Sequence, residues 1–114
     1  MELSELTYKL RTETEVWRTL DEYPNYKFSS LGKIIDKEGN ELKTYIKESK
    51  YSQSKCLIVN IINKDGVRQN RSVANLIATV FVLNPNKYKK IIHKDNDVYN
   101  NNYHNLIWYK GGRY

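Results

Sequence analysis

The stretch from Val73 to Trp108 constrains the fold of this 114-residue chain more than any other. It opens with an apolar run of helical spacing over Val73–Val82. Ser72 is a suitable N-cap, and Asn84-Pro85 ends the helix because proline cannot continue it. A basic strand, an Asn-rich turn and a second short strand follow. This order predicts an α+β fold. The predicted apolar helix face consists of Val73, Leu76, Ile77, Val80 and Phe81.

A β-hairpin is predicted just before this helix. Cys56–Asn63 is apolar and β-branched, Lys64-Asp65-Gly66 has the composition of a tight turn, and Val67–Ser72 returns. Since strand side chains alternate between two faces, Val67, Gln69 and Arg71 share one face and Arg68, Asn70 and Ser72 share the other. Arg68, Gln69 and Arg71 are candidate nucleic-acid contacts, because such side chains pair with base edges. The alternative is an ordinary exposed strand.

Positive charge is concentrated in the middle of the chain, whose net charge is +6. Residues 1–42 carry six Lys or Arg against nine Asp or Glu, residues 43–94 carry eleven against two, and residues 95–114 carry two against two. Such a patch suits phosphate neutralisation, although a solvated lysine-rich surface is the alternative. Further candidate contacts surround Tyr88 and His93. They are Lys87, Lys89, Lys90 and Lys94.

Three segments are expected, within what the length makes one compact domain. Residues 1–14, with leucines at near-helical spacing, predict a short helix or arm. Residues 15–45 predict an aromatic β unit with strands near 26–28, 33–35 and 41–45, and residues 46–55 predict a loop. Residues 46–114 form the remaining unit. The aromatics Trp17, Tyr23, Tyr26 and Phe28 are expected in the core rather than stacked on bases.

Composition argues against several classes of protein. No stretch approaches a membrane span, and the acidic start has no signal-peptide pattern, so an intracellular location is expected. The lone Cys56 excludes an internal disulfide and is interpreted as a packed hydrophobe. Abundant Tyr, Asn, Lys and Ile are typical of AT-rich genomes such as those of viruses and phages.

Two motifs, in order, carry a family resemblance. Segment 15–34 is similar to the modular motif found N-terminal to HNH domains, and segment 73–108 resembles the HNH nucleases of the homing-endonuclease kind. The N-terminal matches are Glu15, Trp17, Leu20, Tyr23, Tyr26, Phe28, Ser29, Gly32 and Ile34. The C-terminal matches are Leu76, Ala78, Phe81, Asn84, Pro85, His93, Asp95, Asn100, Asn101, Asn105, Leu106 and Trp108.

The resemblance implies roles for two residues. His93 stands at the family's general base, which deprotonates a water for attack on phosphate, and Asn105 at its structural asparagine, which ties two strands together. A retained core or turn residue and a phosphate hydrogen-bond donor are alternative roles for His93. A substitute metal site formed by His93, Asp95 and His104 is a further alternative.

Departures from the family pattern point away from catalysis. Ile92 stands where the family has an Asn or Asp metal ligand, and isoleucine offers no oxygen to a cation. Ala74 and Asn75 replace a histidine and an arginine. The family's second ligand lies on a helix about twenty residues beyond the histidine, where this sequence reaches Tyr114. A truncated ββα-metal unit without a metal is therefore expected.

Three functions are compatible with these observations. The leading hypothesis is a protein that binds double-stranded DNA, derived from an HNH homing-type endonuclease and lacking metal-dependent cleavage. The second is a residual nickase that uses His93 and Mg²⁺. The third is a viral or phage inhibitor that binds a host protein through exposed tyrosines.

Overall fold

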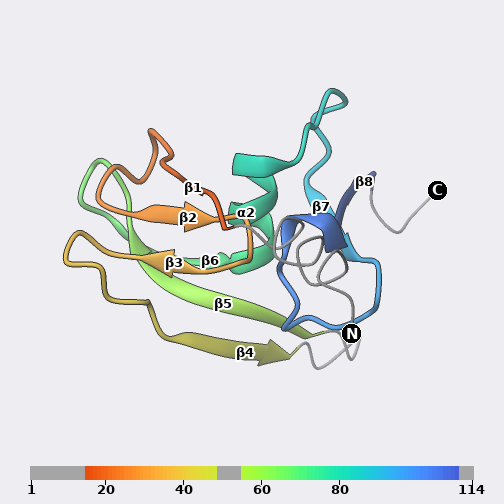
Figure 1. Cartoon of the computed structure of the whole chain (residues 1–114), viewed down its shortest axis with the longest axis horizontal. Coiled ribbons are helices and arrows are strands. Elements are labelled where there is room, and N and C mark those ends of the chain that lie inside the picture. Colours follow the sequence, from red (N-terminus) through yellow and green to blue (C-terminus); the bar gives the residue numbers. More distant parts are fainter. Residues whose placement is uncertain (1–14, 49–54, 111–114) are drawn as a thin grey trace, which may run out of the picture.

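The computed structural model describes residues 15–48 and 55–110. The helix or arm expected over residues 1–14 lies outside the described residues. Three small antiparallel sheets surround one central helix, α2 (Figure 1). The α+β class predicted from the sequence is confirmed.

The first sheet is built by the aromatic β unit. Its strands are β1 (Trp17–Arg18), β2 (Lys27–Ser29) and β3 (Ile34–Ile35), in the order β1-β2-β3. Phe28 and Ile34 lie opposite each other in the register and are both buried. Trp17, by contrast, is 37% exposed, so the expectation that all four aromatics enter the core fails at this residue. Trp17 pairs with Ser29 on β1, one of the two edge strands of this sheet.

The second sheet contains the predicted hairpin. Its strands are β4 (Thr44–Glu48), β5 (Lys55–Ile62) and β6 (Arg68–Ser72), in the order β4-β5-β6. The Asn63 side chain closes the β5–β6 turn, accepting hydrogen bonds from the backbone N–H groups of Asp65 and Val67, both at 2.9 Å. The loop expected over 46–55 is wrong at both ends, because β4 pairs along β5 from Thr44↔Val59 to Glu48↔Lys55. Residues 49–54 lie outside the described residues.

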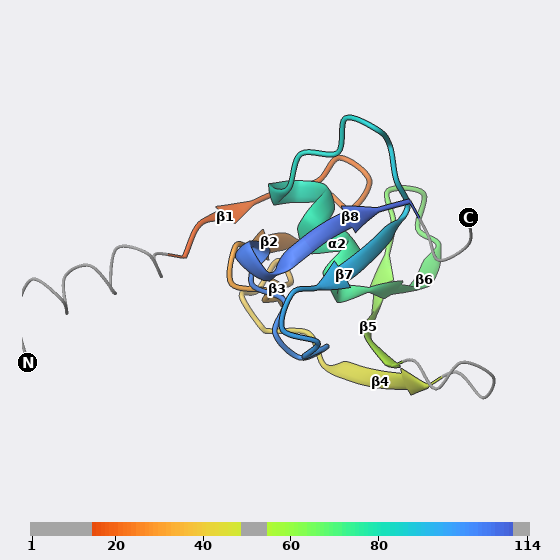
Figure 2. The same ribbon diagram turned by 90° about the vertical axis from the view of Figure 1, so that its right-hand side faces the viewer.

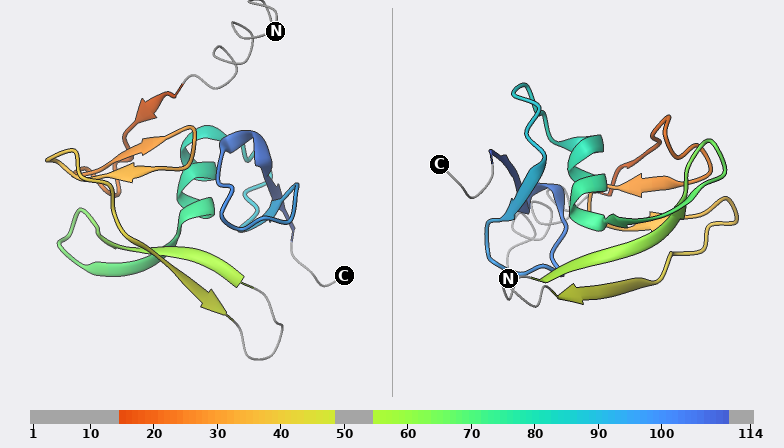
Figure 3. Two further views of the ribbon diagram at one scale, coloured as in Figure 1. Left: turned by 60° about the horizontal axis from the view of Figure 1, so that its bottom comes forward. Right: turned by 180° about the vertical axis from the view of Figure 1, so that it is seen from behind.

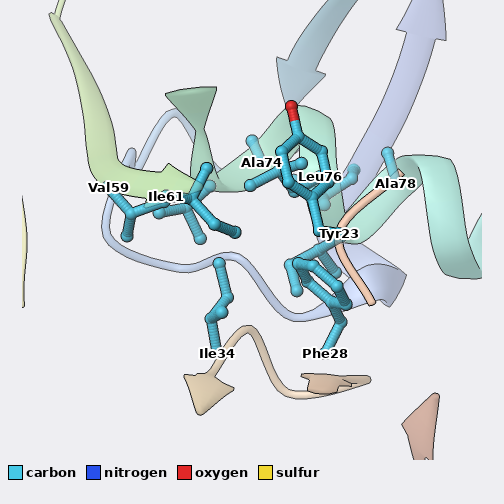
Figure 4. Close-up of a cluster of buried hydrophobic side chains, with 11 residues drawn as sticks. Tyr23, Phe28, Ile34, Val59, Ile61, Ala74, Leu76 and Ala78 are labelled. Atoms are coloured by element: carbon cyan, nitrogen blue, oxygen red, sulfur yellow. The ribbon is translucent and has the colours of Figure 1, made fainter. Parts of the chain in front are cut away.

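Helix α2 (Val73–Phe81) organises the core. Ser72 caps it as predicted, its hydroxyl accepting a hydrogen bond from the Asn75 N–H at 3.2 Å. Leu76 and Ile77 are buried, while Val80 and Phe81 are only partly buried. In Figure 4, Ala74 and Leu76 lie toward Val59 and Ile61 of β5, whereas Ala78 lies on the side of Tyr23 and Phe28, and all belong to one buried cluster. The small Ala74 and Ala78 allow this close approach, so one core spans both units.

The third sheet is a two-stranded hairpin of β7 (Lys90–His93) and β8 (Leu106–Tyr109), preceded by the 3₁₀ turn η1 (Tyr103–Asn105). Helix α2 lies between this hairpin and the other two sheets (Figures 1 and 3). The Trp108 indole N–H donates to the Val82 carbonyl at 3.1 Å, which ties β8 to the end of the helix. None of the helices in the described part of the chain has the length and apolar character to cross a membrane.

Gly32 of the aromatic unit packs closely against the turn that follows β7. Its φ is +97°, and a Cβ added there would lie 2.9 Å from the backbone carbon and oxygen of Asn101. The Tyr103 N–H also donates to the Ser30 carbonyl at 2.9 Å. This contact fixes where the 95–105 segment sits against the first sheet.

Replacing Gly32 by alanine is expected to destabilise the fold more than the same change at Gly39. Gly39 has a φ of +88° but no heavy atom within 4 Å of an added Cβ. Gly39→Ala should therefore cost only the backbone strain, about 1–2 kcal/mol. Gly32→Ala adds an overpacking cost of about 1 kcal/mol or more. Urea denaturation measures both, and equal losses of free energy of unfolding would contradict the contact.

Candidate functional site

His93, the last residue of β7, lies on the inward face of the hairpin. It pairs with Leu106, and Ile91 pairs with Trp108. Paired residues of an antiparallel ladder share one face, so these four side chains point toward the helix side. His93 is accordingly half-buried.

Asn101 holds the His93 ring. Its Oδ1 lies 2.8 Å from His93 Nε2, while its Nδ2 donates to the Val98 carbonyl at 3.1 Å. Because the amide nitrogen is committed to Val98, the oxygen faces the ring, and Nε2 must carry the proton. The Nδ1 atom is therefore the ring nitrogen that does not contact Asn101. Asn101 is only 3% exposed. The sequence pattern included Asn101 but assigned it no role, since the partner is set by the loop fold.

Asn105 fixes the loop between the two strands of the hairpin. Its Nδ2 donates to Asp95 Oδ1 and to the Asn100 carbonyl, both at 2.9 Å, and its Oδ1 accepts from the Asp95 N–H at 3.2 Å. Its own carbonyl accepts from the Lys94 N–H at 2.8 Å. The residue thus connects the end of β7 to the start of β8 through both side-chain and backbone hydrogen bonds.

Asp95 is the acceptor at the centre of this loop. Its Oδ2 accepts from the Asn100 amide at 2.8 Å, and its Oδ1 accepts from the Asp97 N–H and the Asn105 amide at 2.9 Å. These hydrogen bonds, that from Asn100 first, lower the pKa of Asp95 from 3.8 to about 2. Both carboxylate oxygens therefore accept hydrogen bonds from within the turn.

Within residues 15–48 and 55–110, no three His, Cys, Asp or Glu side chains lie close enough together to hold a metal ion. Ile92 points to the opposite face from His93, where it pairs with Ile107, and both are 42% exposed. At this pair the outward face of the hairpin is therefore hydrocarbon, and Ile92 offers no ligand to a hard cation. Nor do His93, Asp95 and His104 form a metal-binding group within residues 15–48 and 55–110.

Arg68 belongs to an exposed polar row on the outer face of β5 and β6. Its guanidinium donates to Asn60 Oδ1, and Asn60 Nδ2 donates to Asn70 Oδ1 at 2.9 Å. Arg68 and Asn70 are exposed. The row thus presents a guanidinium and two amides, the groups that hydrogen-bond base edges.

Gln69 and Arg71 occupy the other face, where both contact Tyr23. The Tyr23 hydroxyl donates to Gln69 Oε1 and accepts from the Arg71 guanidinium, which lies 5.7 Å from the centre of the Tyr23 ring. Tyr23 is 1% exposed, so its hydroxyl requires these partners. Arg68 therefore lies on the opposite face of β6 from Gln69 and Arg71.

The four candidate lysines are all exposed. They are Lys87, Lys89, Lys90 and Lys94. The Lys89 backbone is fixed by its carbonyl, which accepts from the Asn75 amide of α2 at 3.3 Å. Lys90 and Ile92 alternate with inward-facing residues of β7 and so lie on its outward face.

Known proteins share parts of this sequence and this fold. No protein-family model matches the chain. A protein of Acanthamoeba polyphaga mimivirus named as an uncharacterized HNH endonuclease is 32% identical over 92 residues, which are 81% of this chain and 26% of that protein. The structure of the HNH homing endonuclease I-HmuI, solved in a study of its DNA binding and cleavage, matches with a TM-score of 0.68 at 25% identity, over 82% of this chain and 52% of that chain.

A central helix packed against a β-hairpin that carries His93 and Asn105 defines the class as HNH-type α+β proteins. The chain is an HNH homing-endonuclease-like protein, as the sequence motifs predicted. It spans about a quarter of the mimivirus relative and about half of the I-HmuI chain.

Acid titration should reveal the Asp95 network. Because the pKa of Asp95 is lower in the folded chain than the ordinary 3.8, its contribution to stability is present above about pH 4 and is lost as pH falls through about 2. NMR titration of the Asp95 carboxyl carbon should give a midpoint near 2, and Asn100→Ala should raise it. An Asp95 midpoint that Asn100→Ala leaves unchanged would show that the amide does not hold the carboxylate.

Proposed function

We propose that this chain binds double-stranded DNA on the HNH scaffold and that its described residues do not carry out metal-dependent cleavage. The observation that carries the proposal is Ile92. This residue precedes His93 in the sequence, at the position where the family resemblance implies an oxygen ligand, and its exposed side chain is hydrocarbon. Without a cation to stabilise the charge that develops on phosphate, a histidine alone supplies little rate enhancement.

Binding is supported by the distribution of exposed charge. Residues 43–94 hold eleven Lys or Arg against two Asp or Glu. Lysines in this segment suit phosphate oxygens, which position a protein on DNA without reading sequence. The row formed by Asn60, Arg68 and Asn70 suits base edges in the major groove, because guanidinium and amide groups form paired hydrogen bonds there.

DNA binding should depend strongly on salt, and the exposed lysines should account for part of that dependence. Fluorescence anisotropy with a labelled duplex over a salt series measures the slope of log Kd against log salt. Each lysine that contacts a phosphate contributes about 0.9 to this slope. The triple variant Lys87→Ala, Lys89→Ala, Lys90→Ala should weaken binding and lower the slope by up to about 3.

Lys37→Ala provides the matched control, because Lys37 is equally exposed but lies in the acidic N-terminal part of the chain. It should leave affinity and slope unchanged. A wild-type protein that does not bind at low salt, or binds without regard to salt, would overturn the proposal.

A residual nickase is the second candidate, and the orientation of His93 favours it. Because Nε2 is the nitrogen that contacts Asn101, Nδ1 is the ring atom positioned to accept a proton, as a general base requires. The I-HmuI structure concerns DNA cleavage as well as binding. Mg²⁺ would be the expected cofactor in this case.

Plasmid nicking in the presence of Mg²⁺ separates the two candidates. Wild type and His93→Ala should both leave supercoiled plasmid intact, because Ile92 offers no oxygen at the position where the family resemblance implies a metal ligand. Nicking by the wild type that His93→Ala abolishes would establish the nickase instead. The host-protein partner and the intracellular location stay predictions from the sequence.

A further inference from the structure

Leu83 is exposed to an unusual degree. Its exposed fraction is 91%, whereas the next large hydrophobic residue among those described, Tyr99, is at 66%. Leu83 lies between α2 and β7, in a segment that protrudes from the body of the molecule (Figures 1 and 2). Covering this side chain with an apolar partner would be favourable, because it removes apolar surface from water.

Hydrogen bonds hold the chain on both sides of Leu83. On one side, the Val82 N–H donates to the Ala78 carbonyl at 2.8 Å, and the Val82 carbonyl accepts from Trp108 at 3.1 Å. On the other side, the Asn84 amide donates to the Tyr88 carbonyl at 2.8 Å and accepts from the Tyr88 N–H at 2.9 Å. The leucine is thus presented by a fixed backbone.

Cationic side chains flank this leucine. Leu83 and Lys94 line one cleft of about 550 Å³, between the protruding segment and the β7–β8 hairpin. Leu83 and Arg18 line a second cleft of about 330 Å³, where the Arg18 guanidinium lies 5.0 Å from the centre of the Phe81 ring. Lys87 closes the turn after Leu83, its N–H donating to the Asn84 carbonyl at 3.1 Å.

We propose that Leu83 is an apolar wedge that enters between neighbouring base pairs of duplex DNA and bends it. An apolar side chain with cations on both sides matches the chemistry of a base step, in which the stacked bases are apolar and the phosphates lie at the edges. Arg18, Lys87 and Lys94 then contact phosphates on either side of the inserted side chain. This inference rests on the proposed DNA binding. The additional contacts made by the bent duplex offset the cost of partly unstacking the base step.

Fluorescence energy transfer between dyes at the two ends of a duplex tests the wedge. A duplex of about 20 base pairs is stiff, because DNA keeps its direction over about 150 base pairs. In EDTA and at saturating protein, wild type should raise the transfer efficiency, since bending shortens the end-to-end distance. Leu83→Ala should lose most of that rise while the duplex remains bound through the flanking cations. Leu83→Phe should keep it, because phenylalanine also serves as a wedge.

Val67→Ala is the matched control. Val67 is another exposed aliphatic residue, 52% exposed, at the end of the β5–β6 hairpin turn. This variant should bend DNA as the wild type does. Binding with an energy-transfer rise that Leu83→Ala leaves unchanged would overturn the wedge alone. Absence of binding by the wild type at low salt would overturn the proposed DNA binding, and the wedge with it.

Discussion

Burial of α2 is the constraint on which the rest of this structure depends. The helix packs against β2, β5 and β6 on one side and against the β7–β8 hairpin on the other. Each sheet is too small to bury an apolar face alone, so each packs against the helix. The small side chains of Ala74 and Ala78, both buried, let the sheets approach closely enough to form one core.

The second constraint is the network of buried amides after β7. Asn101 and Asn105 are 3% and 8% exposed, and every hydrogen bond they make is to the loop itself or to His93. Buried polar groups that are fully satisfied rigidify and specify a local structure. The network therefore sets the orientation of His93 independently of any cation. Ile92 makes none of these hydrogen bonds, so the geometry of the loop does not depend on the side chain at that position.

A shared fold does not by itself determine the chemistry of a site. The HNH scaffold and its likeness to I-HmuI establish the architecture, but function depends on the particular side chains that the scaffold carries. Here those side chains are an exposed isoleucine beside the histidine, exposed lysines on the strand that leads to it, and a leucine presented between cations. The proposed DNA binding and the proposed wedge both rest on these side chains.

The sequence by itself determined the helix and its cap, the β5–β6 turn, the family and the hydrocarbon at Ile92, because these depend on local periodicity, turn chemistry and residue identity. Tertiary structure decided the rest. Strand β4 formed in a polar segment because β5 offered an unpaired edge. Gln69 and Arg71 turned inward because the buried Tyr23 hydroxyl needed partners. Asn101 met His93, and Leu83 was left in solvent, because contacts between residues distant in sequence placed them there.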